Sequence, residues 1–134
     1  MYRTGNTTTS QMSQKELALR FLTRTRSELA QMRACLPDPQ VPIDMLNMRL
    51  LEGMSAKVAS TAEAFGFPEI GVIAGAIELL SQTGAGRSTV RERFALAQRL
   101  GAQLGALEVH LEYELAEWAA HQFPDELENI PISA

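Results

Sequence analysis

Two histidines and two glutamates near the end of the chain have the spacing of metal ligands on one helical face. They are His110, Glu114, Glu117 and His121, and a helix brings residues at this spacing to the same side. Imidazole and carboxylate groups bind metal ions in helical proteins, but the ligands usually come from several facing helices. No other predicted helix has an obvious set of such residues. We therefore expect a solvated polar face, without a metal ion or another cofactor.

Other residues with catalytic potential lack the context that they need. Residues 83–89, TGAGRST, have the glycines of a phosphate-binding loop, but not its lysine, its spacing or its preceding strand. We interpret this segment as the end of one helix and the start of the next. Cys35 has no histidine near it in the sequence, so we expect a buried or half-buried structural thiol. The sequence predicts a protein that is not an enzyme.

The amino-acid composition and charge indicate which fold class the chain has and which kinds of partner it does not bind. The chain has 134 residues, of which 46% are hydrophobic and only 6% aromatic, a balance that suits helix packing better than a sheet. The net charge of −4 argues against nucleic acid, because its binding proteins have a basic face. No apolar run approaches the roughly 18 residues that span a bilayer. The single cysteine fits a reducing compartment, so we expect a cytoplasmic protein that binds neither nucleic acid nor membrane.

Four segments have the hydrophobic spacing of amphipathic helices, with prolines, glycines and capping residues at their ends. The expected ranges are 13–36, 42–65, 68–81 and 89–122. A capping box of Ser13 and Glu16 predicts the first start, and Pro42 is expected to be the first residue of the second helix. A second capping box, Thr89 with Glu92, predicts the fourth start.

Residues 13–123 are predicted to form one all-α domain, an antiparallel up-down four-helix bundle with a long C-terminal helix, because helices joined by short connections pack in this way. Residues 1–12 are expected to be a flexible segment, and residues 124–134 an irregular tail. Gly66 is expected to end the second helix in a left-handed conformation. The core residues expected on the second helix are Leu46, Leu50, Leu51, Met54, Val58, Ala62 and Phe65.

Small residues form a smooth stripe on the predicted last helix. Gly101 and Gly105 are four residues apart, with Ala97 and Ala102 beside them. The charged residues around them exclude a membrane motif. The stripe therefore predicts either close helix packing or a contact between two copies in a homodimer.

The stretch from Ala56 to Ile70, AKVASTAEAFGFPEI, resembles the core of histidine-phosphotransfer (HPt) domains. Those domains typically read His-Lys-Leu-x-Gly-Ser-Ala-x-x-Phe-Gly-Phe-x-x-Leu here, followed by Ala-x-x-Leu-Glu, a continuation that residues 74–78 fit. Residues 21–29 look like the helix that leads into such domains. The likeness covers roughly residues 17–100 and is sharpest from 56 to 78. It implies a helical bundle of a two-component phosphorelay.

The reactive histidine of that family is missing. The register set by Gly66 places Ala56 at the position of the histidine that accepts phosphate, and the hydrophobic spacing predicts that this position is exposed. Alanine has no nucleophile. Ser60 stands where the family has a glycine, and Glu63 would repel a phosphoryl group. Lys57 is retained beside the vacant position, where the family's lysine can attract a phosphorylated partner.

The resemblance therefore implies a pseudo-HPt signalling protein that binds a response-regulator receiver domain or a histidine kinase without carrying phosphate. The expected partner-binding residues are Glu52, Gly53, Ala56, Lys57, Ser60, Glu63 and Phe67. Two other interpretations stay open: an engineered His-to-Ala form of an active HPt domain, and a helical adaptor or dimerisation module unrelated to phosphotransfer. Ser60 and Glu63 argue against the engineered form, because such a change would leave the rest of the face in family form.

Overall fold

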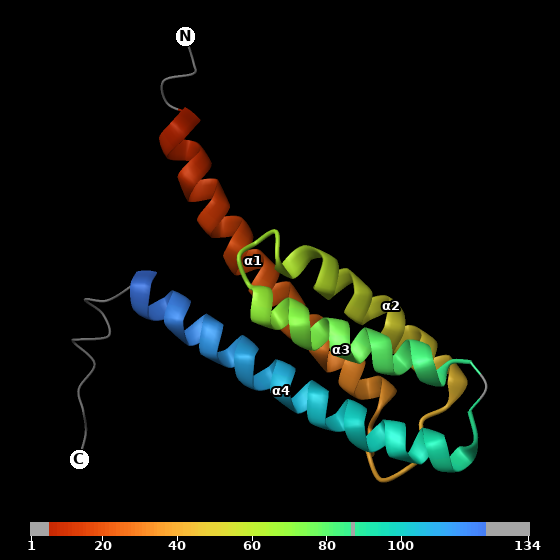
Figure 1. The fold of residues 1–134 in the computed structure, drawn as a ribbon. Helices are drawn as coiled ribbons and strands as arrows, with labels where there is room; N and C mark the ends of the chain where they lie inside the picture. The colour runs from red at the N-terminus through yellow and green to blue at the C-terminus, as the bar shows by residue number, and fades with distance from the viewer. Residues whose placement is uncertain (1–5, 87, 123–134) are drawn as a thin grey trace, which may run out of the picture.

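The computed structural model describes residues 6–86 and 88–122, and their regular structure is all α-helical (Figure 1). The helices are α1 (Asn6–Cys35), α2 (Met45–Ala62), α3 (Pro68–Gly84) and α4 (Val90–Gln122). This part of the chain contains four helices and no strand, which confirms the predicted all-α class. None of the described helices has an apolar stretch long enough to cross a bilayer.

The four helices pack around a shared core. α2 packs on α3, α3 on α4, and α1 lies against both α4 and α2. The first turns of α1 and the last turns of α4 extend past the α2–α3 connection (Figure 1). α4 has 33 residues, about 50 Å of helix, so the long final helix is confirmed.

The core is mainly aliphatic, as the composition predicts. Its largest fully buried hydrophobic side chains are Leu22, Met32, Met48, Leu51, Val58, Ile70, Ile77, Leu100, Leu104, Leu107 and Leu111. Three aromatic rings close the core beside the α2–α3 connection. Phe21 of α1 stacks on Phe65 at a centroid distance of 5.2 Å and on Phe67 at 5.7 Å. Contacts between these rings tie α1 to that connection.

Two predicted helix starts are wrong. α1 begins at Asn6, so Ser13 and Glu16 lie within the helix and do not cap it. α2 begins at Met45 and has Asp44 as its N-cap; the carboxylate of Asp44 accepts a hydrogen bond of 2.7 Å from the backbone N–H of Asn47. A capping carboxylate satisfies an amide that has no partner within the helix, which is why the helix begins after Asp44 and not at Pro42.

Several other features of the helix ends agree with the sequence, although α2 ends at Ala62, three residues before its expected end. Thr89 and Glu92 form the predicted capping box through two hydrogen bonds of 3.1 Å. The bonds from the Thr89 backbone and side chain lower the pKa of Glu92. Gly66 adopts the expected left-handed conformation, with φ of 87°, and Pro68 opens α3. α3 continues to Gly84, three residues beyond its expected end.

The core face of α2 differs from the predicted one. Its buried residues are Met48, Leu51, Ser55, Val58 and Ala62. Leu46 and Leu50 were expected in the core, but they are 67% and 48% exposed. The buried face passes through Ser55, whose hydroxyl donates a 2.6 Å hydrogen bond to the carbonyl oxygen of Leu51. That bond allows a polar residue to be buried, and a pattern of apolar residues alone does not reveal it.

The small-residue stripe on α4 is used only in part. A Cβ at Gly101 would lie 2.9 Å from Cβ of Pro39, whereas a Cβ at Gly105 would meet nothing within 4 Å. Gly101 therefore allows close packing, but against the α1–α2 connection and not against a helix. Ala102 is exposed. The fold of one chain leaves this side of Gly105 open.

Replacing Gly84 by alanine is expected to lower the free energy of unfolding by about 1–3 kcal/mol. Gly84 is buried, and a Cβ there would overlap side-chain atoms of Leu96 and Met48. Gly75 of the same helix is the matched control, because a Cβ at this site meets nothing within 4 Å. Gly75→Ala should raise the free energy of unfolding by roughly 0.5–1 kcal/mol through helix propensity. Urea unfolding followed by circular dichroism measures both; equal effects would contradict the packing at Gly84.

Candidate partner-binding surface

The predicted partner-binding residues lie mainly on the side of α2 that faces away from the core. Gly53, Lys57, Ser60 and Glu63 are exposed. A Cβ at Gly53 would meet nothing within 4 Å, so the surface is open at this point. Because these residues recur at helical spacing, the structure brings them together on one surface.

Ala56 is half-buried and not fully exposed as the spacing predicted. Its neighbour one turn on, Ala59, faces α3: the Ala59 carbonyl oxygen lies 3.6 Å from the position of a Cβ on Gly71. Ala56 and the half-buried Glu52 therefore lie at the edge of the surface next to α3. The shift follows from burial of Ser55, which rotates α2 relative to the predicted core face.

Two hydroxyl groups beside position 56 are occupied by the helix itself. The Ser60 hydroxyl donates to the carbonyl oxygen of Lys57 at 3.1 Å, and the Thr61 hydroxyl donates to the same oxygen at 2.8 Å. Such bonds are common for serine and threonine within helices. Neither hydroxyl has a neighbouring base to activate it among the contacts of the described residues. Both hydroxyls are therefore engaged by the backbone of α2.

Phe67 does not join the other predicted residues. Its ring is half-buried and stacks on Phe21 of α1, with an interplanar angle of 10°. Its backbone N–H donates to the carbonyl oxygen of Ala62 at 2.9 Å. Phe67 therefore holds the α2–α3 connection against α1. Two of the predicted binding residues, Glu63 and Phe67, follow the end of α2, and only Glu63 adds its side chain to the exposed surface.

Leu46 and Leu50 lie on the same surface and were missed as site residues because the hydrophobic pattern assigned them to the core. They occur at positions 46 and 50, and Gly53, Lys57 and Ser60 continue the series. We call these five residues the outer face of α2. It combines two exposed leucines with exposed small and polar residues.

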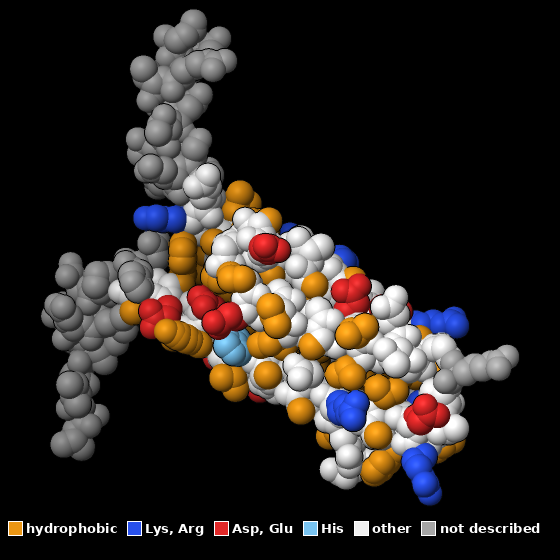
Figure 2. Space-filling view, viewed as in Figure 1, with side chains coloured by type: hydrophobic (Ala, Val, Ile, Leu, Met, Phe, Trp, Pro, Cys, Tyr) orange, Lys and Arg blue, Asp and Glu red, His pale blue; other side chains and the backbone are white. Residues whose placement is uncertain are grey.

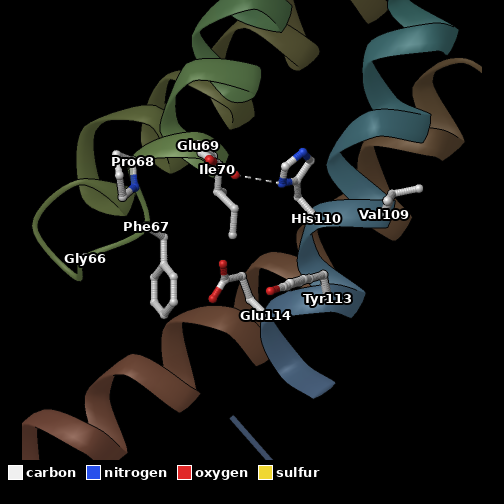
Figure 3. Close-up of a pocket in the computed structure, with 9 residues that line it drawn as sticks. All are labelled: Gly66, Phe67, Pro68, Glu69, Ile70, Val109, His110, Tyr113 and Glu114. Atoms are coloured by element: carbon white, nitrogen blue, oxygen red, sulfur yellow. Dashed lines mark ion pairs between the residues drawn. The ribbon is translucent and has the colours of Figure 1, made fainter. Parts of the chain in front are cut away.

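A second feature lies between the start of α3 and the second half of α4. It is an open pocket of about 460 Å³, which we call the His110 pocket (Figure 3); its lining residues are Gly66, Phe67, Pro68, Glu69, Ile70, Val109, His110, Tyr113 and Glu114. His110 Nδ1 lies 3.3 Å from a carboxylate oxygen of Glu69. The residue pattern does not predict the contact between Glu69 and His110, because contacts between helices depend on how the helices align.

The predicted polar face of α4, which begins at His110, does not form one group of side chains in the described part of the structure. His110 contacts Glu69 of α3, and Glu114 points into the pocket beside Tyr113 (Figure 3). The side chain of His121 lies outside the described residues. Within the described residues, no group of three or more histidine, cysteine, aspartate or glutamate side chains is arranged to hold a metal ion.

The burial of Cys35 and the helix boundaries near residues 83–89 agree with the sequence. Cys35 is buried; this burial, and secondarily the charge of Asp44, raise the pKa of its thiol. α3 ends at Gly84 and α4 begins at Val90, as the interpretation of residues 83–89 requires. The Ser88 hydroxyl donates to the carbonyl oxygen of Gly84 at 2.9 Å.

Comparisons of the chain with protein-family models, curated proteins and solved structures find no match. The likeness to HPt domains is therefore carried by the residues of the sequence, above all those from 56 to 78.

Proposed function

We propose that this protein is a cytoplasmic pseudo-HPt signalling protein, which binds a response-regulator receiver domain or a histidine kinase and carries no phosphate. The observation that carries the proposal is the outer face of α2. Leu46 and Leu50 are 67% and 48% exposed on the helix that bears Ala56 at the expected phosphohistidine position. An apolar patch with a polar border supports binding of another protein.

The proposal includes an HPt-like fold, an antiparallel up-down four-helix bundle. Ion pairs between α1 and α4 support it, because later residues of α1 contact earlier residues of α4. Along α1 and α4, Arg33 lies 3.0 Å from Glu108, whereas Arg26 lies 4.0 Å from Glu112. The α2–α3 connection also lies at the end of the molecule opposite the other two connections (Figure 1).

The inability to carry phosphate follows from the chemistry of position 56. A phosphoryl group moving from an aspartyl phosphate needs a nucleophile to receive it, and the alanine methyl group offers none. The exposed Glu63, which directly follows α2, adds a negative charge about two turns away. Lys57 is exposed, and its ammonium group can attract an acidic or phosphorylated partner. The surface thus favours docking without transfer.

Replacing Leu50 by glutamate is expected to weaken binding to the cognate receiver or kinase by at least about tenfold, since it places a charge in the apolar part of the interface. Leu50 is 48% exposed, so the variant should remain folded. Val90→Glu is the control, because Val90 is 60% exposed at the start of α4. Calorimetry should show weaker binding only for Leu50→Glu; equal affinities for both variants would place the interface elsewhere.

A further inference from the structure

The outer side of α4 carries a second helical seam that the fold does not cover. It consists of Arg99, Ala102, Ala106, Val109 and Tyr113, which we call the outer seam; Ala106 is half-buried and the other four are exposed. These positions alternate spacings of three and four residues, the pattern by which one helix packs along another. Val109 is 66% and Tyr113 52% exposed. The core of the bundle uses a different face of α4, which includes Leu104 and Leu107.

Apolar residues of α3 broaden this surface. Val72 is 73% exposed and Leu79 63% exposed. Figure 2 shows hydrophobic side chains across the α3–α4 face, with acidic side chains grouped beside the histidine and Lys or Arg side chains toward the start of α4. Exposed apolar patches of this kind mark interaction sites.

The charges at the two ends of the outer seam are opposite in sign. The His110 pocket at one end contains the carboxylates of Glu69 and Glu114. Arg91 and Arg99 are exposed at the other end. Glu92 lies there too, but its carboxylate accepts a hydrogen bond from the backbone N–H of Thr89. One end is therefore acidic and the other mainly basic.

The seam is also nearly symmetric about its midpoint. Ala106 lies midway between Arg99 and Tyr113 along the helix. Beside it, a Cβ at Gly105 would meet nothing within 4 Å. Small side chains at a crossing point let two helices approach closely. If two such helices cross antiparallel at Ala106, the basic end of each meets the acidic end of the other.

We propose that two copies of this chain form a dimer about a two-fold axis near Ala106, with their outer seams packed antiparallel. Arg99 of each copy faces the His110 pocket of the other. The carboxylates of that pocket can accept hydrogen bonds from a guanidinium group, and the ring of Tyr113 offers it a face for a cation–π contact. A two-fold dimer requires a surface that is complementary to itself, and the opposite charges at the two ends meet this requirement. The interface lies on α3 and α4, so it is separate from the outer face of α2.

The area of the α3–α4 surface determines how tightly the two copies are expected to bind. α3 is about 25 Å long, and two helices side by side are about 20 Å wide, so about 500 Å² of each copy is available. The total of about 1,000 Å² lies at the low end for specific interfaces. We therefore expect a dimer with a dissociation constant in the micromolar range, on the order of 1–100 µM.

Sedimentation equilibrium from about 1 µM to about 1 mM tests the dimer across that range. We expect a monomer–dimer equilibrium for the unaltered chain and a monomer for Val109→Glu. Leu46→Glu is the control, because Leu46 is 67% exposed but lies on α2, and it should dimerise normally. A monomer at every concentration, or loss of the dimer in Leu46→Glu but not in Val109→Glu, would overturn the proposal.

Charge exchange tests the antiparallel arrangement. Arg99→Glu should weaken the dimer by about tenfold, because it sets like charges against each other at both ends of the interface. Adding Glu69→Arg to that variant restores opposite charges and should recover most of the affinity. Unchanged affinity in Arg99→Glu, or no recovery in the double variant, would contradict the placement of Arg99 at the His110 pocket of the second copy.

Discussion

Replacing Leu51 by alanine is expected to lower the free energy of unfolding by about 2–5 kcal/mol. The Leu51 side chain is completely buried, with 0% exposure, in the same core cluster as Met48 and Val58. Its truncation removes buried apolar surface and leaves a cavity that a packed helical core fills only in part. Urea unfolding followed by circular dichroism gives the change directly.

The adjacent Leu50 is a matched control for this experiment. The sequence pattern assigned both leucines to the core, yet Leu50 is 48% exposed. Leu50→Ala should therefore cost less than about 1 kcal/mol, as expected for a surface substitution. Similar losses for Leu50→Ala and Leu51→Ala would contradict the orientation of α2, and with it the outer face on which the proposed function depends.

The double variant Ala56→His with Glu63→Ala is expected to accept a detectable amount of phosphate, whereas the unaltered protein is expected to accept none. The imidazole nitrogen would attack the aspartyl phosphate of a receiver, the bond from phosphorus to the aspartate oxygen would break, and the receiver would regain its carboxylate. Gly53, one turn earlier, has open space around it, which leaves room for the ring. Label transfer from phosphorylated receivers measures the gain.

Two further variants make this result specific. Ala56→His with Glu63 retained should take less label than the double variant, because the glutamate repels the incoming phosphoryl group. Ala56→Asn with Glu63→Ala should take none, since an amide is no phosphate acceptor. Absence of label on the histidine variant, with receiver binding intact, would contradict the register that places Ala56 at the reactive position.

Local signals in the sequence predicted much of the helical framework. The Thr89–Glu92 capping box, the left-handed Gly66 and the start of α3 at Pro68 depend on a few neighbouring residues. Such features follow from backbone geometry and hydrogen bonding within one turn. The start of α1 was missed because a Ser–x–x–Glu pattern caps a helix only where the chain before Ser13 is not itself helical.

The orientation of α2 and the contacts between helices were not predictable in the same way. Burial of Ser55 depends on its hydrogen bond to Leu51. Because Ser55 faces the core, Leu46 and Leu50 lie on the surface and not in the core where they were expected. The pair of Glu69 and His110 joins residues of different helices, so it depends on how α3 and α4 align. Hydrophobic periodicity records the face of each helix, but not this alignment.

The most direct test of the proposed function is to mix the unaltered protein with each cognate receiver domain carrying labelled phosphate, and to measure both binding and transfer. Calorimetry should show that at least one receiver or the cognate histidine kinase binds, while the label stays on the receiver or is lost to water. Label on any residue of this protein would contradict the pseudo-HPt account. Failure of every cognate receiver and kinase to bind would contradict it as well.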